Sequence, residues 1–238
     1  MSIPIVWAIF KKEIKIYFVS PLAYVFLTVF LFLAGLFFFL GISISGEASL
    51  RVMVGNLAIS LLFLLPMLTM RHFAEERRQG TFELLMTSPV SLQSLIFGKW
   101  LASLALVVIM LACTGLFPLI LAHYGDPDWG VIFTSYVGLI LVAGAFCAAG
   151  LFSSSLTNDQ VAAGMLGVLI LLPFWLIGSA TSILGEQWAE TLEQFALLPH
   201  LRSFGKGTID SSDVVWFIGF IFTFLFLTYR SLESKRWR

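Results

Sequence analysis

The densest group of chemically capable residues lies at 71–91, RHFAEERRQGTFELLMTSPVS, between two long apolar runs. Its ionisable side chains are suited to ion pairs, and they are Arg71, His72, Glu75, Glu76, Arg77, Arg78 and Glu83. A solvated charged loop would account for these residues alone. The apolar Phe82, Leu84, Leu85 and Met86 favour a different interpretation, because such side chains need a groove to fill. The stretch is therefore predicted to dock onto a partner protein.

Local signals divide this stretch, which we call the elbow, into two short helices. The first permits a helix that continues the preceding apolar run, and Gly80 interrupts it because glycine is a poor residue for helix interiors. Thr81 is expected to cap the second helix, FELLM. Pro89 ends it, since the residue before a proline leaves helical geometry. Ser91 is expected to cap the next long helix.

Motifs for other chemistry are absent from the sequence. There is no Gly-x-x-x-x-Gly-Lys-[Ser/Thr], so this chain is not expected to bind or hydrolyse ATP itself. His72, His123 and His200 are far apart, which argues against a shared metal site. No pair of a nucleophilic side chain and a base to activate it is evident, which argues against an intramembrane hydrolase. Cys113 and Cys147 lie in apolar runs and are expected to pack as small hydrophobic residues. We expect no catalytic, metal-binding or cofactor-binding residue, and no enzyme activity.

The elements that position the elbow follow from composition. The 238 residues are 59% hydrophobic and 12% charged, whereas soluble domains carry about 25% charged residues. A lipid-facing exterior is required, and the zero net charge gives no sign of nucleic-acid binding. The predicted fold class is an all-α membrane protein with six transmembrane helices. The predicted spans lie near 21–42, 52–70, 95–121, 131–154, 160–184 and 213–231.

The N-terminal residues 1–20 form a separate unit. Residues 3–19 are predicted to form an amphipathic helix on the membrane surface with its lysines on the polar side, and we expect no cleaved signal peptide. Residues 21–238 form the six-span domain, which includes the elbow at 71–91 and an outer loop at 185–212. Small residues in the fourth and fifth predicted spans indicate close helix packing.

Orientation follows from the distribution of lysine and arginine, which concentrate on the cytoplasmic side of membrane proteins. With the N-terminus inside, the outside holds only Arg51, Arg202 and Lys206. The inside holds eleven cations, which are Lys11, Lys12, Lys15, Arg71, Arg77, Arg78, Lys99, Arg230, Lys235, Arg236 and Arg238. Both termini and the elbow are therefore predicted to be cytoplasmic.

The predicted spans carry almost no ionisable residue in their middle thirds. Ion-coupled transporters usually keep such groups, because a buried charge is costly and therefore retained for a purpose. Their absence argues against proton or sodium coupling. It fits energy supplied from outside the membrane domain, and a cargo that meets an apolar surface.

Four stretches resemble a known family. Residues 75–102, EERRQGTFELLMTSPVSLQSLIFGKWLA, resemble the ABC-2 type permeases, the membrane subunits of one class of ABC transporter. Residues 11–26, 151–165 and 200–217, which read KKEIKIYFVSPLAYVF, LFSSSLTNDQVAAGM and HLRSFGKGTIDSSDVVWF, resemble the gliding-motility-associated branch of that family. The resemblance covers nearly the whole chain.

This resemblance implies a transporter of two permease subunits and two cytoplasmic ABC ATPase subunits. The ATPases would bind the ATP and Mg, and the second permease would be an identical copy or a related subunit. The elbow residues implied to couple to the ATPase are Glu75, Glu76, Arg77, Arg78, Gly80, Thr81, Phe82, Glu83, Leu85 and Met86. A second cytoplasmic contact is implied at Asn158, Asp159 and Gln160. The implied location is the bacterial cytoplasmic, or inner, membrane.

Two functions follow as expectations. In the first, the chain couples ATP hydrolysis by a separate subunit to export or movement of a lipidic, amphipathic or polymeric cargo. In the second, the same fold transmits ATP-driven motion to extracytoplasmic partners without moving cargo, and the outer loop is the docking surface for an auxiliary protein. Transport of a labelled lipid by the reconstituted complex discriminates between them.

Overall fold

The computed structural model describes residues 3–45, 49–82, 90–180 and 194–236, and the described part is built from helices. This confirms the predicted all-α class. The helices are α1 Ile3–Val19, α2 Pro21–Ser45, α3 Arg51–Thr69, α4 Arg71–Arg78, α6 Leu92–Thr114, α7 Leu116–Tyr124, α8 Trp129–Leu156, α9 Gln160–Ala180, α11 Leu197–Gly205 and α12 Ser211–Arg236.

Six helical segments of the described chain are long and apolar enough to cross a membrane. They are Pro21–Ile44, Arg51–Arg78, Leu92–His123, Trp129–Leu156, Gln160–Gly178 and Ser211–Ser234. The number matches the six predicted spans, and each predicted span overlaps one of these segments, although residues 181–184 of the fifth prediction lie outside the described residues. The chain is a multi-pass membrane protein.

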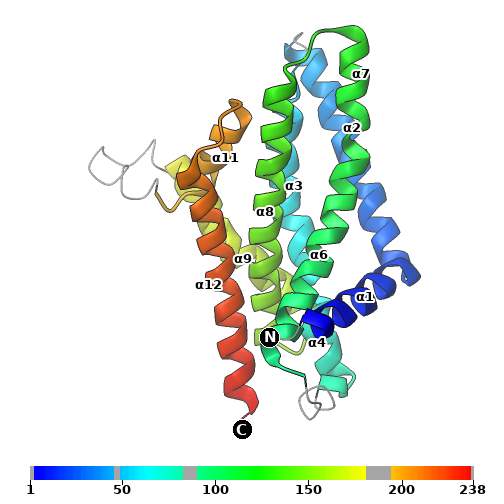
Figure 1. Cartoon of the computed structure of the whole chain (residues 1–238), viewed down its shortest axis with the longest axis vertical. Coiled ribbons are helices and arrows are strands. Elements are labelled where there is room, and N and C mark those ends of the chain that lie inside the picture. The colour runs from blue at the N-terminus through cyan, green and yellow to red at the C-terminus, as the bar shows by residue number, and fades with distance from the viewer. Residues whose placement is uncertain (1–2, 46–48, 83–89, 181–193, 237–238) are drawn as a thin grey trace.

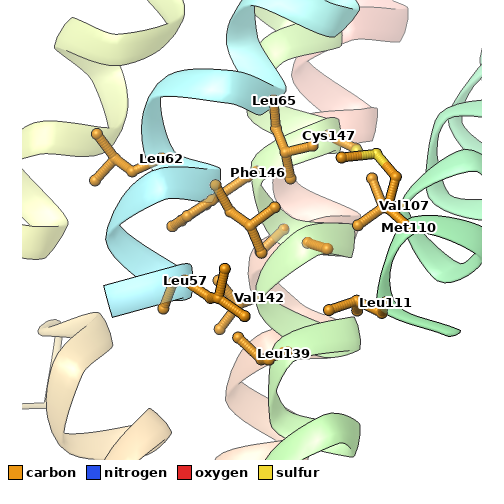
Figure 2. Close-up of a cluster of buried hydrophobic side chains, with 14 of the residues drawn as sticks. Leu57, Leu62, Leu65, Val107, Met110, Leu111, Leu139, Val142, Phe146 and Cys147 are labelled. Carbon is orange, nitrogen blue, oxygen red and sulfur yellow. The ribbon is translucent and has the colours of Figure 1, made fainter. Parts of the chain in front are cut away.

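Helix α8 stands at the centre of the bundle and packs against α3, α6, α9 and α12 (Figure 1). Its apolar side chains meet those of two neighbouring helices in the core that Figure 2 shows. Leu65 of α3, Phe146 of α8 and Met110 of α6 are among the buried side chains there. Cys147 of α8 is buried in the same cluster and forms no disulfide, as expected for a cysteine packed as a small hydrophobic residue.

Small residues let the neighbours approach α8 closely. A Cβ added at Gly144 would stand 3.1 Å from Ile221 of α12, and the backbone carbonyl of Gly144 accepts a 2.9 Å hydrogen bond from Trp100 Nε1 of α6. A Cβ added at Gly167 of α9 would stand 2.8 Å from Pro66 of α3. The prediction of close helix packing is confirmed at these positions.

The third span differs from its prediction as one helix near 95–121. It begins earlier, at Leu92, because Ser91 Oγ accepts a hydrogen bond from the Ser94 backbone N–H, 3.3 Å away; the predicted cap is confirmed. It divides into α6 and α7 around Gly115, whose N–H bonds to the Ala112 carbonyl at 3.0 Å. Pro118 causes the division, because proline has no N–H to continue the helical ladder.

Both chain ends lie at the same end of the bundle, together with α1 and α4, whereas α7 and α11 lie toward the opposite end (Figure 1). We call these the terminal end and the far end. The predicted N-terminal helix at 3–19 is confirmed as α1, and it runs across the ends of the spans at the terminal end. Its three lysines are exposed, but Glu13 and Tyr17 on its other face are buried.

Candidate functional site

The elbow begins with α4, which continues the second span almost without a break. Met70 joins α3 to α4 in helical geometry and donates its N–H to the Pro66 carbonyl, 2.9 Å away. Gly80 interrupts the helix as predicted. Its φ of +70° lies in the left-handed region that favours glycine, and its N–H bonds to the Arg77 carbonyl at 3.1 Å.

A lysine of the third span holds the elbow to the rest of the protein. Lys99 of α6 is only 1% exposed. Its Nζ donates hydrogen bonds to Glu76 Oε1 of α4 at 2.7 Å, to Glu13 Oε1 of α1 at 2.9 Å and to the His72 carbonyl at 3.0 Å. All three ammonium donors are satisfied. A buried ammonium is tolerated only when it is paired and hydrogen-bonded in this way.

A layer of neutral polar groups lies behind this lysine. His72 Nε2 stands 2.6 Å from Ser103 Oγ and 2.9 Å from the Tyr17 hydroxyl, and Tyr17 and Ser103 are 3.3 Å apart. Together, these polar groups tie α1, α4 and α6 to one another at the terminal end. We call the six residues the charge cluster: Glu13, Tyr17, His72, Glu76, Lys99 and Ser103.

Electrostatics fix the protonation states on the α1 side of the charge cluster. Burial raises the pKa of Glu13, but the Lys99 cation above all, with Lys12, outweighs burial and holds that pKa below its usual range. Glu13 is therefore an ionised partner for Lys99. Burial raises the pKa of Tyr17, so its hydroxyl keeps its proton.

A cleft of about 700 Å³ lies beside the charge cluster, between α1 and the elbow. Charges of both signs line it, including Lys12 and Arg71 as well as Glu75. Glu76 also lines it, and its second oxygen, Oε2, is buried and has no hydrogen-bond partner among the described residues. Only one of the two carboxylate oxygens of Glu76 therefore has a hydrogen-bond partner among the described residues.

A serine of the fourth span connects the elbow to the centre of the bundle. Ser154 Oγ of α8 accepts hydrogen bonds from the backbone N–H groups of Phe73 and Ala74, at 3.0 and 3.2 Å, and donates to the Met70 carbonyl at 2.8 Å. The first N–H groups of a helix have no partner within it, and Ser154 satisfies two of them. Sequence reasoning did not anticipate this link between the elbow and the SSSLTNDQ segment.

Taken together, these contacts can carry displacement rather than perform bond chemistry. They join α4 to α6 and α1 through the Lys99 ion pairs and to α8 through Ser154. A family model described as ABC-2 family transporter protein matches residues 7–206, which contain the whole charge cluster. The chain belongs to the ABC-2 transporter family.

The family of ABC-2 permeases consists of membrane components of ABC transporters, and membership implies an ABC ATPase subunit as partner. Such a component is typically not catalytic itself. A search of curated proteins found no match to the chain. The predicted superfamily is therefore confirmed, and the charge cluster is a feature of an ABC-2 permease.

The structure of this permease describes seven of the ten predicted elbow residues. Glu83, Leu85 and Met86 lie outside the described residues. Phe82 is half-buried and packs edge-on against Phe73 of α4, with ring centroids 6.5 Å apart. The Arg77 guanidinium lies over the Phe82 ring, 4.9 Å from its centroid. Phe82 therefore has partners within its own chain, in addition to its predicted role in ATPase binding.

The four charged residues of α4 that are implied to couple to the ATPase, Glu75, Glu76, Arg77 and Arg78, differ in their surroundings. Glu76 pairs with a fully buried cation. Glu75 accepts a 2.6 Å hydrogen bond from Gln79, and Arg78 is exposed. Arg77 Nη1 and Nη2 are buried without a hydrogen-bond partner in the described part of the chain.

The second predicted contact, at Asn158, Asp159 and Gln160, forms the turn between α8 and α9. Asp159 Oδ1 accepts a hydrogen bond from the Ala162 N–H at 3.0 Å and so caps α9. The turn lies four residues beyond Ser154, and α4 packs against both α8 and α9. The two predicted contacts are thus held near each other, and their binding role stays a prediction.

Sequence reasoning missed Lys99, which was treated as one of eleven cytoplasmic cations. A signal was present. Lys99 stands four positions before Ser103, and Glu13 stands four positions before Tyr17, so each pair shares one helix face. A charged residue and a hydroxyl on one face of an apolar helix indicate a polar contact with another helix.

Proposed function

We propose that this chain is the membrane subunit of an ABC transporter in which a separate cytoplasmic ATPase acts on the elbow, and that the charge cluster passes the movement to the spans. The observation that carries the proposal is Lys99, which joins Glu76 of the elbow to Glu13 of α1 inside the protein. The ATPase would contact the elbow and the Asn158–Gln160 turn.

The mechanism rests on stiffness. A buried ion pair resists separation, because removing one partner leaves an uncompensated charge away from water. A push on α4 is therefore expected to move α6 and α1 with it rather than to break the Lys99 contacts. Ser154 carries the same push to α8. The elbow is thus expected to act on three helices, which are α1, α6 and α8.

Unsatisfied groups on α4 support a change of conformation during the cycle. A buried polar group without a hydrogen-bond partner costs about 1–3 kcal/mol, and more when it is charged. Arg77 Nη1, Arg77 Nη2 and Glu76 Oε2 are such groups among the described residues. Binding of the ATPase would relieve this cost by rearranging the elbow and supplying partners.

Cargo and assembly form the finer part of the proposal. A lipidic, amphipathic or polymeric cargo suits the apolar spans, and two permease copies with two ATPases form the complex in the bacterial inner membrane, with both termini cytoplasmic. The three stretches that resemble the gliding-motility-associated branch, at 11–26, 151–165 and 200–217, support a place in that branch. The mechanical transmitter without cargo remains the second candidate, because the same stiffness serves it equally.

The experiment compares two isosteric variants one residue apart. Glu76→Gln weakens the ion pair with Lys99, whereas Glu75→Gln changes a carboxylate that contacts only Gln79 among the described residues. Each permease is co-expressed with the ATPase subunit of its operon, purified in mild detergent and assayed for bound ATPase and for ATP hydrolysis.

We expect Glu76→Gln to retain the ATPase but to hydrolyse ATP several-fold more slowly, and Glu75→Gln to slow hydrolysis less, because Glu75 forms no ion pair with Lys99. Equal hydrolysis by both variants would rule out transmission through the charge cluster. Failure of the wild-type permease to retain any ATPase would overturn the transporter assignment itself.

A further inference from the structure

A second cavity lies at the far end of the bundle, remote from the charge cluster. Its volume is about 320 Å³, and it lies between α3, α9 and α11. Arg51 at the start of α3, Arg202 on α11 and Lys206 just after α11 all line it. These are the three cations that the sequence placed on the outer side, and the fold brings them to one place.

The cations of this cavity are available to a ligand. All three are exposed, and none forms a salt bridge within 4.0 Å with a carboxylate of the described residues. Arg51 also borders a neighbouring cavity that contains Asp126 and Asp128. Among the described residues, no acidic side chain lines this cavity beside Arg202 and Lys206, which form the stronger half of the site.

The remaining walls are apolar. Val54 of α3, Trp175 of α9 and Leu201 of α11 line the cavity, and no acidic side chain of the described residues does. Two glycines widen it, because a Cβ added at Gly55 or Gly205 would meet no atom within 4 Å. The cavity therefore pairs a cationic rim with an apolar wall at the end of membrane-spanning helices.

We propose that this cavity binds an anionic phospholipid, with the phosphate held by Arg202 and Lys206 and the first acyl carbons against Val54 and Trp175. Arginine and lysine bind phosphate by charge-assisted hydrogen bonds. Tryptophan is favoured at the level of the headgroups, where an apolar ring meets a polar boundary. The apolar wall and the position at the ends of α3 and α9 favour a lipid over a free anion.

The proposal does not depend on the ATPase, because lipid binding is measured on the permease alone. The purified permease in mild detergent is titrated with dioleoylphosphatidylglycerol, which is anionic, or dioleoylphosphatidylcholine, which is zwitterionic. Native mass spectrometry counts the bound lipids. Glycerol phosphate, the soluble headgroup analogue, is tested as a competitor.

Two variants address the two halves of the site. Arg202→Gln/Lys206→Gln removes the cations, and Lys15→Gln, an exposed cation at the terminal end, is its control. Gly55→Phe fills the cavity without changing any charge. Its control is Gly219→Phe, since Gly219 of α12 is also an exposed helical glycine whose added Cβ would meet nothing within 4 Å.

We expect one phosphatidylglycerol to be retained in preference to phosphatidylcholine, with an affinity about tenfold lower in each site variant and unchanged in each control. Equal binding of the two lipids would overturn the proposal. Competition by glycerol phosphate at the same concentration as phosphatidylglycerol would also overturn the proposal. The apolar wall would then contribute nothing to binding. If Gly55→Phe does not fold, the double charge variant decides the result.

Discussion

Lys99 of α6 and Glu76 of α4 form a 2.7 Å ion pair with Lys99 almost completely withdrawn from solvent, although the two residues stand 23 positions apart in the chain. Surface ion pairs contribute little to stability, but a buried pair is costly to break from one side. The elbow is therefore fixed to the third span by an interaction that resists being pulled apart.

Replacing this lysine should be strongly destabilising. Lys99→Met leaves Glu13 and Glu76 close together without their cation, and we expect the protein to lose about 3–5 kcal/mol of stability. Thermal unfolding in detergent measures the effect. Lys15→Met, at an exposed position of α1, is the control and should unfold like the wild type.

A neutral version of the site tests the same reasoning. The triple variant Lys99→Met/Glu13→Gln/Glu76→Gln leaves no buried charge, so it should unfold at a higher temperature than Lys99→Met alone. A triple variant no more stable than the single one would show that lost packing, rather than charge, accounts for the destabilisation.

Acid should weaken the attachment of α1. The pKa of Glu13 is lower in the folded protein than its ordinary value of 4.5. Its contribution to stability is therefore complete above pH 4.5 and is lost as the pH falls through the lower, folded-state pKa. Melting temperatures between pH 7 and pH 3 should show the wild type approaching Glu13→Gln at the acid end. A constant difference across this range would contradict the pKa direction.

The serine that joins α4 to α8 should act as a helix cap. Ser154→Ala leaves the Phe73 and Ala74 N–H groups without their acceptor, and we expect a loss of about 0.5–2 kcal/mol. Ser153→Ala is a matched control, because the hydrogen bond that Ser153 Oγ forms within the described part of the chain goes to the Gly150 carbonyl of its own helix. Equal melting temperatures for the two variants would argue against the cap.

The angle of the elbow should depend on Gly80. A Cβ there meets no atom within 4 Å, so any effect of Gly80→Ala comes from the left-handed backbone, at about 1–2 kcal/mol. We expect reduced ATP hydrolysis with nearly normal insertion and ATPase binding. Gly80→Asn should be milder, since asparagine tolerates this conformation. An unaltered rate of ATP hydrolysis in Gly80→Ala would show that coupling does not depend on the angle of the elbow.

The two halves of the elbow should have different roles in the complex. Phe82→Ala removes apolar surface and is expected to weaken ATPase association, by up to about 1.5–3 kcal/mol if the ring is fully buried there. Arg77→Ala is expected mainly to reduce stimulation of hydrolysis. A pull-down and an ATPase assay on one membrane preparation of each variant measure both quantities. Wild-type behaviour of both variants in both assays would show that neither side chain takes part in coupling to the ATPase.

Much of the architecture was predictable because lipid imposes a simple rule. Every span must bury its backbone polar groups in a helix and present apolar side chains, so hydropathy located all six. Two local predictions are also confirmed, because they depend on backbone groups only a few residues away. Ser91 caps α6, and Gly80 ends α4. Pro118 and Gly115 divide the third span, which hydropathy alone does not register.

The charge cluster was not predictable in the same way. Glu13 and Lys99 stand 86 positions apart, and the four-residue spacing to Tyr17 and Ser103 indicates a contact with another helix without saying which helix it is. Their pairing depends on how α1 crosses α6, which is a matter of packing. A Cβ added at Gly98 would stand 2.8 Å from Ile9 of α1, so this glycine permits the close approach that brings the two charges together.

The order of the cluster along the chain has a consequence for synthesis. Glu13 and Glu76 both precede Lys99, so both carboxylates have already been made when the ribosome reaches the third span, and chains fold from the N-terminus as they emerge. The lysine never has to enter the bilayer ahead of its counter-ions. A truncated chain that ends after α4 would instead contain both acidic side chains without the buried cation, and only the exposed Lys12 among the described residues would be left to pair with them.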